Sequence, residues 1–124
     1  GIVKSKAETF RNYKFSLCFE NCTSNGYITE KIFDSMFSGC IPIYLGCPNI
    51  KTEIDPDTFI DFRDFSNYKD LYFYIKKMPE KEYLFKLNKI KEFYGVFLNT
   101  TCCDQVWATN VADKCLKLIN KNNN

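Results

Sequence analysis

Five polar or ionisable residues lie close together in the first third of the chain: Glu20, Asn21, Tyr27, Glu30 and Lys31. The Lys31 ammonium can bind a phosphate group, whereas the Glu30 carboxylate would repel one and suits ribose hydroxyls better. Asn21 and Tyr27 can supply neutral donors, and Tyr27 also offers a flat ring face. This combination of residue types indicates a site for a nucleoside diphosphate, with its phosphate and sugar ends contacted separately.

The residues around this group predict a strand, a loop, a helix and a second strand. An apolar run rich in aromatic residues predicts a strand over Tyr13–Phe19, and small polar residues predict a loop over 20–27. Apolar residues then recur with helical spacing between Thr29, the expected cap, and Gly39, the expected end. The apolar run Ile41–Leu45 predicts a buried strand parallel to the first.

In open parallel sheets, ligands bind where strands end and helices begin, and the loop over 20–27 is such a place. The free N–H groups and the dipole at the start of the following helix favour a phosphate. A second interpretation stays open, because Glu30 complements that dipole whatever the ligand and both Glu30 and Lys31 could be solvated. Neither a Gly-x-Gly-x-x-Gly sequence nor a P-loop sequence supports the nucleotide interpretation.

The rest of the chain adds one strand and three helices. We predict a loop over 46–57, a short third strand over Phe59–Phe62, and helices over 67–78, 80–94 and 104–120, the first two separated by Pro79. The order β-α-β-β-α-α-α is typical of an α/β fold, a parallel sheet flanked by helices. The length fits a single domain over residues 1–120, with a disordered tail over 121–124.

Composition excludes several function classes. The net charge of +2 and the lack of a basic block argue against nucleic acid as a partner. The chain has no histidine, which excludes Ser-His-Asp and Cys-His catalysis within it and removes the commonest metal ligand. Asp55-Pro56-Asp57 matches a metal-binding Asp-x-Asp only in its letters, so we expect neither a metal nor another cofactor.

The chain contains seven cysteines but no Cys-x-x-Cys pair, which argues against zinc-ribbon and thioredoxin-like sites. Cys18 and Cys40 lie in apolar runs and are expected in the core. Cys102, Cys103 and Cys115 could include a disulfide in an oxidising compartment, and three free thiols are an equal alternative.

The stretch from 19 to 46 resembles a motif of the α-1,3/1,4-fucosyltransferases, glycosyltransferase family 10. The matching residues are Phe-Glu-Asn at 19–21, Tyr-Ile-Thr-Glu-Lys at 27–31 and Gly-Cys-Ile-Pro-Ile-Tyr-Leu-Gly at 39–46. A weaker resemblance continues through Phe59-Ile60-Asp61 and Asp64-Phe65 to about Tyr83. Cys22 departs from the Ser or Thr that usually follows the Asn, and the last third resembles the family only vaguely.

This resemblance implies the Rossmann-like C-terminal domain of a GT-B glycosyltransferase. It implies that Glu20, Asn21, Tyr27, Glu30 and Lys31 bind the donor GDP-fucose, with Glu30 on the ribose and Lys31 on the diphosphate. The reaction would be an inverting transfer of L-fucose, in α-1,3 linkage, to N-acetylglucosamine or glucose in a glycan acceptor on a glycoprotein, glycolipid or lipopolysaccharide. No catalytic residue is expected in this chain, because the family's general base belongs to the N-terminal domain.

The chain begins at Gly1 without Met and has neither a signal peptide nor a bilayer-spanning run, so we expect part of a two-domain protein that is inactive alone. Any membrane attachment would use a segment outside it. The resemblance implies the lumenal side of the Golgi membrane in a eukaryote, or a bacterial or viral protein, cytoplasmic or membrane-associated, as the alternative. Two other functions stay open: a non-catalytic nucleotide-sugar-binding module, and a GT-B transferase that uses another nucleotide sugar.

Overall fold

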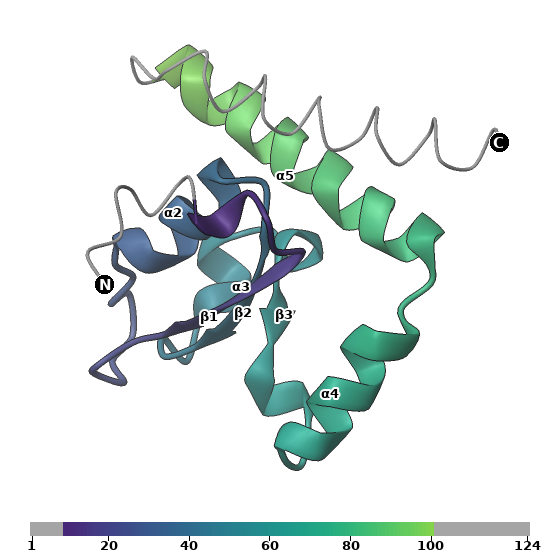
Figure 1. Ribbon diagram of the computed structural model, residues 1–124. Helices are drawn as coiled ribbons and strands as arrows, with labels where there is room; N and C mark the ends of the chain where they lie inside the picture. The colour runs from purple at the N-terminus through teal and green to yellow at the C-terminus, as the bar shows by residue number, and fades with distance from the viewer. Residues whose placement is uncertain (1–8, 101–124) are drawn as a thin grey trace, which may run out of the picture.

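The computed structural model describes the backbone of residues 9–100 and the side chains of residues 9–95. Its centre is a parallel sheet in the order β1 (Phe15–Phe19), β2 (Ile41–Leu45) and β3 (Ile60–Asp61). Helices flank this sheet, and the long helix α5 runs across one end of the strands (Figure 1). The predicted α/β arrangement with parallel strands is therefore present.

The helix α2 (Glu30–Phe37) connects β1 to β2 and packs against both strands. It begins at Thr29, whose side chain accepts a hydrogen bond from the Lys31 N–H, as expected of an N-cap. Ile32 and Met36 form its fully buried face toward the sheet. Gly39 ends the helix in the left-handed conformation, with a φ of 74° that favours glycine.

The pairing of β1 with β2 brings their carboxyl ends to one edge of the sheet. Phe15 lies opposite Ile41, and Phe19 lies opposite Leu45. The pairing continues one residue further, because the Glu20 N–H donates to the Leu45 carbonyl at 2.8 Å. The loop that follows β1 therefore starts at the edge where parallel sheets bind ligands.

The segment between β2 and α4 is more ordered than predicted. The predicted loop over 46–57 contains a short helix α3 (Ile50–Glu53) and most of the 3-10 turn η1 (Pro56–Thr58). The predicted third strand is only two residues long, and the 3-10 turn η2 (Phe62–Asp64) follows it directly. The Asp61 carboxylate accepts the Arg63 N–H at 3.0 Å, which turns the chain and ends the strand there.

Two helices complete the described part of the chain. They are α4 (Tyr68–Lys77) and α5 (Glu80–Thr100), with Pro79 between them as predicted. The predicted end of the second helix near Tyr94 is wrong, since α5 continues through Gly95 to Thr100. The helix predicted over 104–120, the ends of the predicted domain 1–120 and the tail over 121–124 lie outside the described residues.

Aromatic side chains join α5 to the sheet and to α2. The Phe15 and Tyr83 rings meet edge to face at 5.8 Å between centroids, and the Phe37 and Tyr94 rings do so at 4.4 Å. Cys18 and Cys40 are buried, as predicted.

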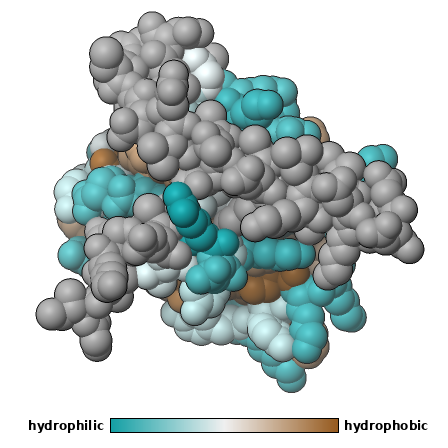
Figure 2. All heavy atoms as spheres, turned by 45° about the horizontal axis from the view of Figure 1, so that its top comes forward, coloured by the Kyte–Doolittle hydropathy of each residue, from teal (hydrophilic) through white to brown (hydrophobic). Residues whose placement is uncertain are grey.

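Most of the described surface visible in Figure 2 is hydrophilic. None of the helices in the described part of the chain is both long enough and apolar enough to cross a membrane.

Candidate functional site

Three of the predicted site residues meet at the carboxyl end of β1. The Lys31 ammonium donates to the Phe19 carbonyl at 3.0 Å and to Asn21 Oδ1 at 3.3 Å. It also lies 3.9 Å from Glu20 Oε2, and the Lys31 side chain is 32% exposed. These contacts therefore hold the half-buried Lys31 ammonium at the edge of the sheet, beside the start of α2.

The Glu20 carboxylate closes the loop that follows β1. Its Oε1 accepts the Thr29 N–H at 2.9 Å, and its Oε2 accepts the Thr29 hydroxyl at 2.7 Å. The Tyr44 hydroxyl also contacts this carboxylate, at 3.4 Å from Oε1. With 0% of its side chain exposed, Glu20 holds the two ends of the loop together rather than facing solvent.

Tyr27 and Glu30 lie on the same junction between loop and helix with exposed side chains. Tyr27 is 42% exposed, although its backbone N–H and carbonyl both have partners. Its N–H donates to the Ser24 carbonyl at 3.1 Å, and its carbonyl lies 3.4 Å from the Tyr44 hydroxyl. Glu30 is the first residue of α2, where its negative charge complements the helix dipole. Both exposed side chains can reach a ligand.

A second segment, the turn after β2, forms hydrogen bonds with this loop. The Gly26 N–H has two acceptors in this turn, Cys47 Sγ at 3.2 Å and Asn49 Oδ1 at 2.9 Å. The Cys47 N–H in turn donates to the Tyr44 hydroxyl at 3.1 Å. Sequence reasoning missed both acceptors, because they lie 21 and 23 residues from Gly26. The signal in the sequence that could have pointed to these two residues was the Gly-Cys-Pro-Asn turn after a buried strand.

Tyr44 links the two segments and stays neutral. Burial raises the pKa of its hydroxyl to about 12, and the negative charge of Glu20 acts in the same direction. A neutral hydroxyl can donate to the Glu20 carboxylate or the Tyr27 carbonyl while accepting the Cys47 N–H.

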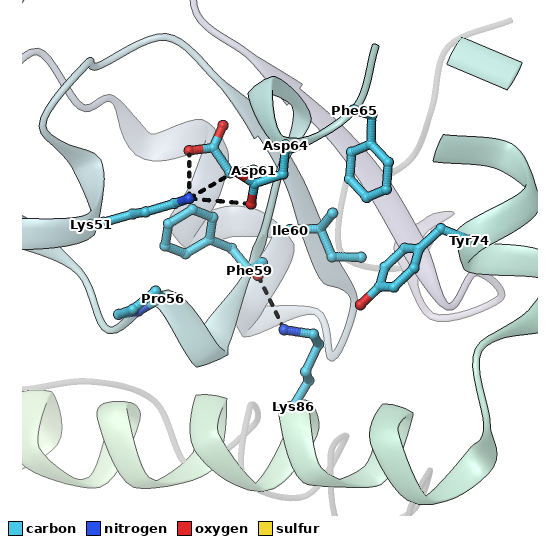
Figure 3. Close-up of a pocket in the computed structure, with 9 residues that line it drawn as sticks. All are labelled: Lys51, Pro56, Phe59, Ile60, Asp61, Asp64, Phe65, Tyr74 and Lys86. Carbon is cyan, nitrogen blue, oxygen red and sulfur yellow. Dashed lines mark hydrogen bonds and ion pairs between the residues drawn. The ribbon is translucent and has the colours of Figure 1, made fainter. Parts of the chain in front are cut away.

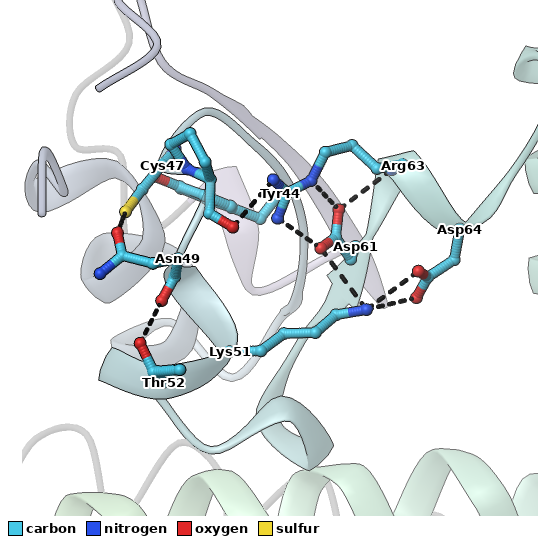
Figure 4. A network of polar contacts seen from close by, with 9 residues as sticks. Tyr44, Cys47, Asn49, Lys51, Thr52, Asp61, Arg63 and Asp64 are labelled. Atoms are coloured by element: carbon cyan, nitrogen blue, oxygen red, sulfur yellow. Dashed lines mark hydrogen bonds and ion pairs between the residues drawn. The ribbon is translucent and has the colours of Figure 1, made fainter. Parts of the chain in front are cut away.

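The end of β3 carries an ionic network (Figure 4). Arg63 Nη2 lies 2.7 Å from Asp61 Oδ2, and Arg63 Nη1 donates to the Pro48 carbonyl at 3.1 Å. Lys51 contacts Asp64 at 2.9 Å and Asp61 at 3.7 Å. Burial alone would raise the pKa of Asp61, but Arg63 and Lys51 together lower it below its usual value. The network thus stabilises an almost fully buried carboxylate.

Beside this network is a cavity of about 180 Å³ (Figure 3). It is lined by residues from α3 through α5: Lys51, Pro56, Phe59, Ile60, Asp61, Asp64, Phe65, Tyr74 and Lys86. None of the five predicted site residues lines it. Within residues 9–100, no group of three or more His, Cys, Asp and Glu side chains is arranged to hold a metal ion.

The family model described as "Glycosyltransferase family 10 (fucosyltransferase) C-term" matches residues 3–124. The chain belongs to this family. The resemblance of the stretch from 19 to 46 to a fucosyltransferase motif is thereby confirmed.

Curated relatives of this family 10 chain come from bacteria, plants and animals. An α-(1,3)-fucosyltransferase of Helicobacter pylori is 47% identical over 74 residues, covering 60% of this chain and 16% of that protein. The mouse 4-galactosyl-N-acetylglucosaminide 3-α-L-fucosyltransferase 9 is 35% identical over 94 residues, covering 73% of this chain and 26% of that protein. The chain therefore spans only a minor part of these relatives.

Solved structures confirm the fold class, that of a GT-B fucosyltransferase. An α1,3-fucosyltransferase solved with GDP-fucose is 44% identical with a TM-score of 0.63, over 68% of this chain and 26% of that one. An α1,3-fucosyltransferase solved with GDP is 34% identical with a TM-score of 0.62, over 85% of this chain and 36% of that one.

Proposed function

We propose that this family 10 chain supplies the GDP-fucose-binding half of an α-1,3-fucosyltransferase. The observation that carries the proposal is the Lys31 ammonium, held at the end of β1 by the Phe19 carbonyl and Asn21 beside the start of α2. A half-buried cation beside the positive end of a helix dipole is suited to a diphosphate. The similarity to structures solved with GDP-fucose and GDP supports the same donor.

The contacts in the site suggest a separate role for each residue. An oxygen of the diphosphate can replace the exposed Asn21 amide as an acceptor for Lys31, because their contact is long, at 3.3 Å. The exposed Glu30 carboxylate can accept hydrogen bonds from the ribose hydroxyls. Tyr27 offers its ring and hydroxyl, while the buried Glu20 acts on the donor only by holding the loop closed.

We propose inverting chemistry for the complete enzyme. The acceptor hydroxyl oxygen would form a bond to the anomeric carbon of fucose as the bond from that carbon to the β-phosphate oxygen breaks. The hydroxyl proton would go to a general base outside this chain, and GDP would leave with the bonding electron pair. Lys31 and the positive end of the α2 dipole would stabilise the negative charge that develops on the departing GDP. The glycan acceptor would be recognised mainly outside the described residues.

Calorimetry on the full-length protein tests the choice of donor. We expect GDP-fucose to bind more tightly than GDP-mannose or UDP-galactose. Lys31→Ala should weaken GDP-fucose binding about ten-fold or more, because a charge-assisted contact is lost. Lys91→Ala is a matched control, since Lys91 is an exposed lysine on α5. Equal binding of another nucleotide sugar, or equal effects of the two substitutions, would contradict the proposal.

A further inference from the structure

The backbone next to Tyr27 is held by the turn after β2, which contains none of the five candidate donor-binding residues. The Gly26 N–H points at two acceptors from the turn after β2, Cys47 Sγ at 3.2 Å and Asn49 Oδ1 at 2.9 Å. These acceptors are themselves joined, because the Cys47 thiol donates to Asn49 Oδ1 at 3.0 Å. We call Cys47, Asn49 and the Gly26 N–H the loop clamp.

The loop clamp depends on an unusual backbone conformation. Gly26 has a φ of 73°, in the left-handed region, and this conformation accompanies the inward-pointing N–H. The next residue, Tyr27, has its N–H bonded to the Ser24 carbonyl and its carbonyl next to the Tyr44 hydroxyl. Three backbone polar groups of this exposed loop, the Gly26 N–H and the Tyr27 N–H and carbonyl, therefore have partners within the chain.

The side chain of Tyr27 contrasts with its backbone. Tyr27 is 42% exposed, so the ordered backbone does not serve to bury its side chain in the core. An ordered backbone that presents an exposed aromatic ring is what a preorganised ligand site requires, since the loop's conformational entropy is lost before the ligand arrives. Cys47 is fully buried and Asn49 only partly so, which gives the loop clamp a rigid base.

We propose that Cys47 and Asn49 are positioning residues for the nucleotide, holding Tyr27 in the conformation that binds it. The inference rests on the proposed function, because it assumes that Tyr27 contacts the donor. Neither residue touches the ligand in this account; each acts through the Gly26 N–H. Losing the loop clamp lowers the fraction of protein with a binding-competent loop, and the apparent affinity falls by the same factor.

Asn49 offers the cleaner test, because it is partly exposed whereas Cys47 lies in the core. Asn49→Leu removes the acceptor at similar size. Asn49→Asp keeps an acceptor but would place a second carboxylate beside Glu53, which now accepts from Asn49 Nδ2 at 3.0 Å. The rescue variant is therefore Asn49→Asp combined with Glu53→Gln. Glu53→Gln alone is the matched control.

The experiment uses the full-length protein and three measurements: hydrogen exchange of the Gly26 amide by NMR, the Kd for GDP, and the kinetics of transfer from GDP-fucose. We expect Asn49→Leu to speed Gly26 exchange, to weaken GDP binding about two- to ten-fold and to raise the KM for GDP-fucose with kcat unchanged. The rescue variant should restore all three values, and Glu53→Gln should change none. The melting temperature is measured for each variant.

The outcomes separate this inference from the proposed function. If the wild-type protein binds no GDP, the proposed function is wrong and the positioning role falls with it. If the wild type binds GDP and Asn49→Leu speeds Gly26 exchange without weakening GDP, the proposed function stands and the positioning role is wrong. A loss of affinity that the rescue variant does not restore would also overturn the positioning role, since it would trace to altered packing.

Discussion

The Tyr44 hydroxyl connects the two segments that build the site. It accepts the Cys47 N–H and lies within donating distance of both the Glu20 carboxylate and the Tyr27 carbonyl. Tyr44→Phe would leave the buried Cys47 N–H without its acceptor. We expect it to lower the free energy of unfolding by about 1–3 kcal/mol at neutral pH, measured by urea denaturation.

The raised pKa of Tyr44 predicts a pH dependence with a definite sign. Because its folded-state pKa of about 12 lies above the usual tyrosine value of 10.0, its contribution to stability is fully present below pH 10. That contribution is lost as the pH rises through 12. The gap in stability between wild type and Tyr44→Phe should therefore narrow over this range. The same substitution at the exposed Tyr72 is the control, and a constant gap for Tyr44→Phe would contradict the prediction.

Individual site residues were predictable from the sequence only in part. The spacing of Asn21 and Lys31 around a strand–loop–helix junction predicted that they share one site, and the structure brings them into contact. The burial of the Glu20 side chain was not predicted. The sequence does not show whether a residue at the boundary between strand and loop continues the strand or begins the exposed loop. Asn49 was missed because its contact with Gly26 depends on how β2 lies beside β1.

At the scale of elements, two glycines should respond oppositely to alanine. A Cβ at Gly46 would lie 2.4 Å from Glu20 Cγ, so Gly46→Ala must displace the side chain that closes the loop, at a cost of about 1–3 kcal/mol. A Cβ at Gly95 meets nothing within 4 Å, and Gly95 lies inside α5. Gly95→Ala should therefore stabilise the protein by about 0.5–1 kcal/mol.

Thermal and urea denaturation of the two variants measure these effects. Destabilisation by Gly95→Ala would show that α5 ends before Gly95, as the sequence had suggested. An unchanged stability of Gly46→Ala would show that Glu20 does not pack against this turn.

Element types were predictable where the hydrophobic period was strong. The change from strand to helical spacing near Thr29 correctly predicted β1, α2 and β2. The short helix α3 and the 3-10 turns have too few residues to show a period, so they were assigned to loop or strand. The helix α5 passes Gly95 because tertiary contacts, such as the Phe37–Tyr94 pair, outweigh one weak helix former.

At the scale of the whole molecule, we expect the proposed diphosphate site to bind its ligand without a divalent metal. The Lys31 ammonium lies at the positive end of the α2 dipole, and the two together can offset the charge of a diphosphate. We predict that EDTA leaves the affinity of the full-length protein for GDP unchanged, as measured by calorimetry. A large loss of affinity in EDTA that Mn²⁺ or Mg²⁺ restores would contradict this prediction.

The most direct test of the donor-site account compares the binding of guanosine and GDP to the full-length protein and two variants. Lys31→Ala should weaken GDP about ten-fold or more and leave guanosine nearly unchanged, because Lys31 acts on the diphosphate. Glu30→Ala should weaken both ligands, because its proposed partners are the ribose hydroxyls. Melting curves establish that each variant is folded. If both variants bind both ligands like the wild type, Glu30 and Lys31 are solvated residues on a helix start, and the donor site lies elsewhere.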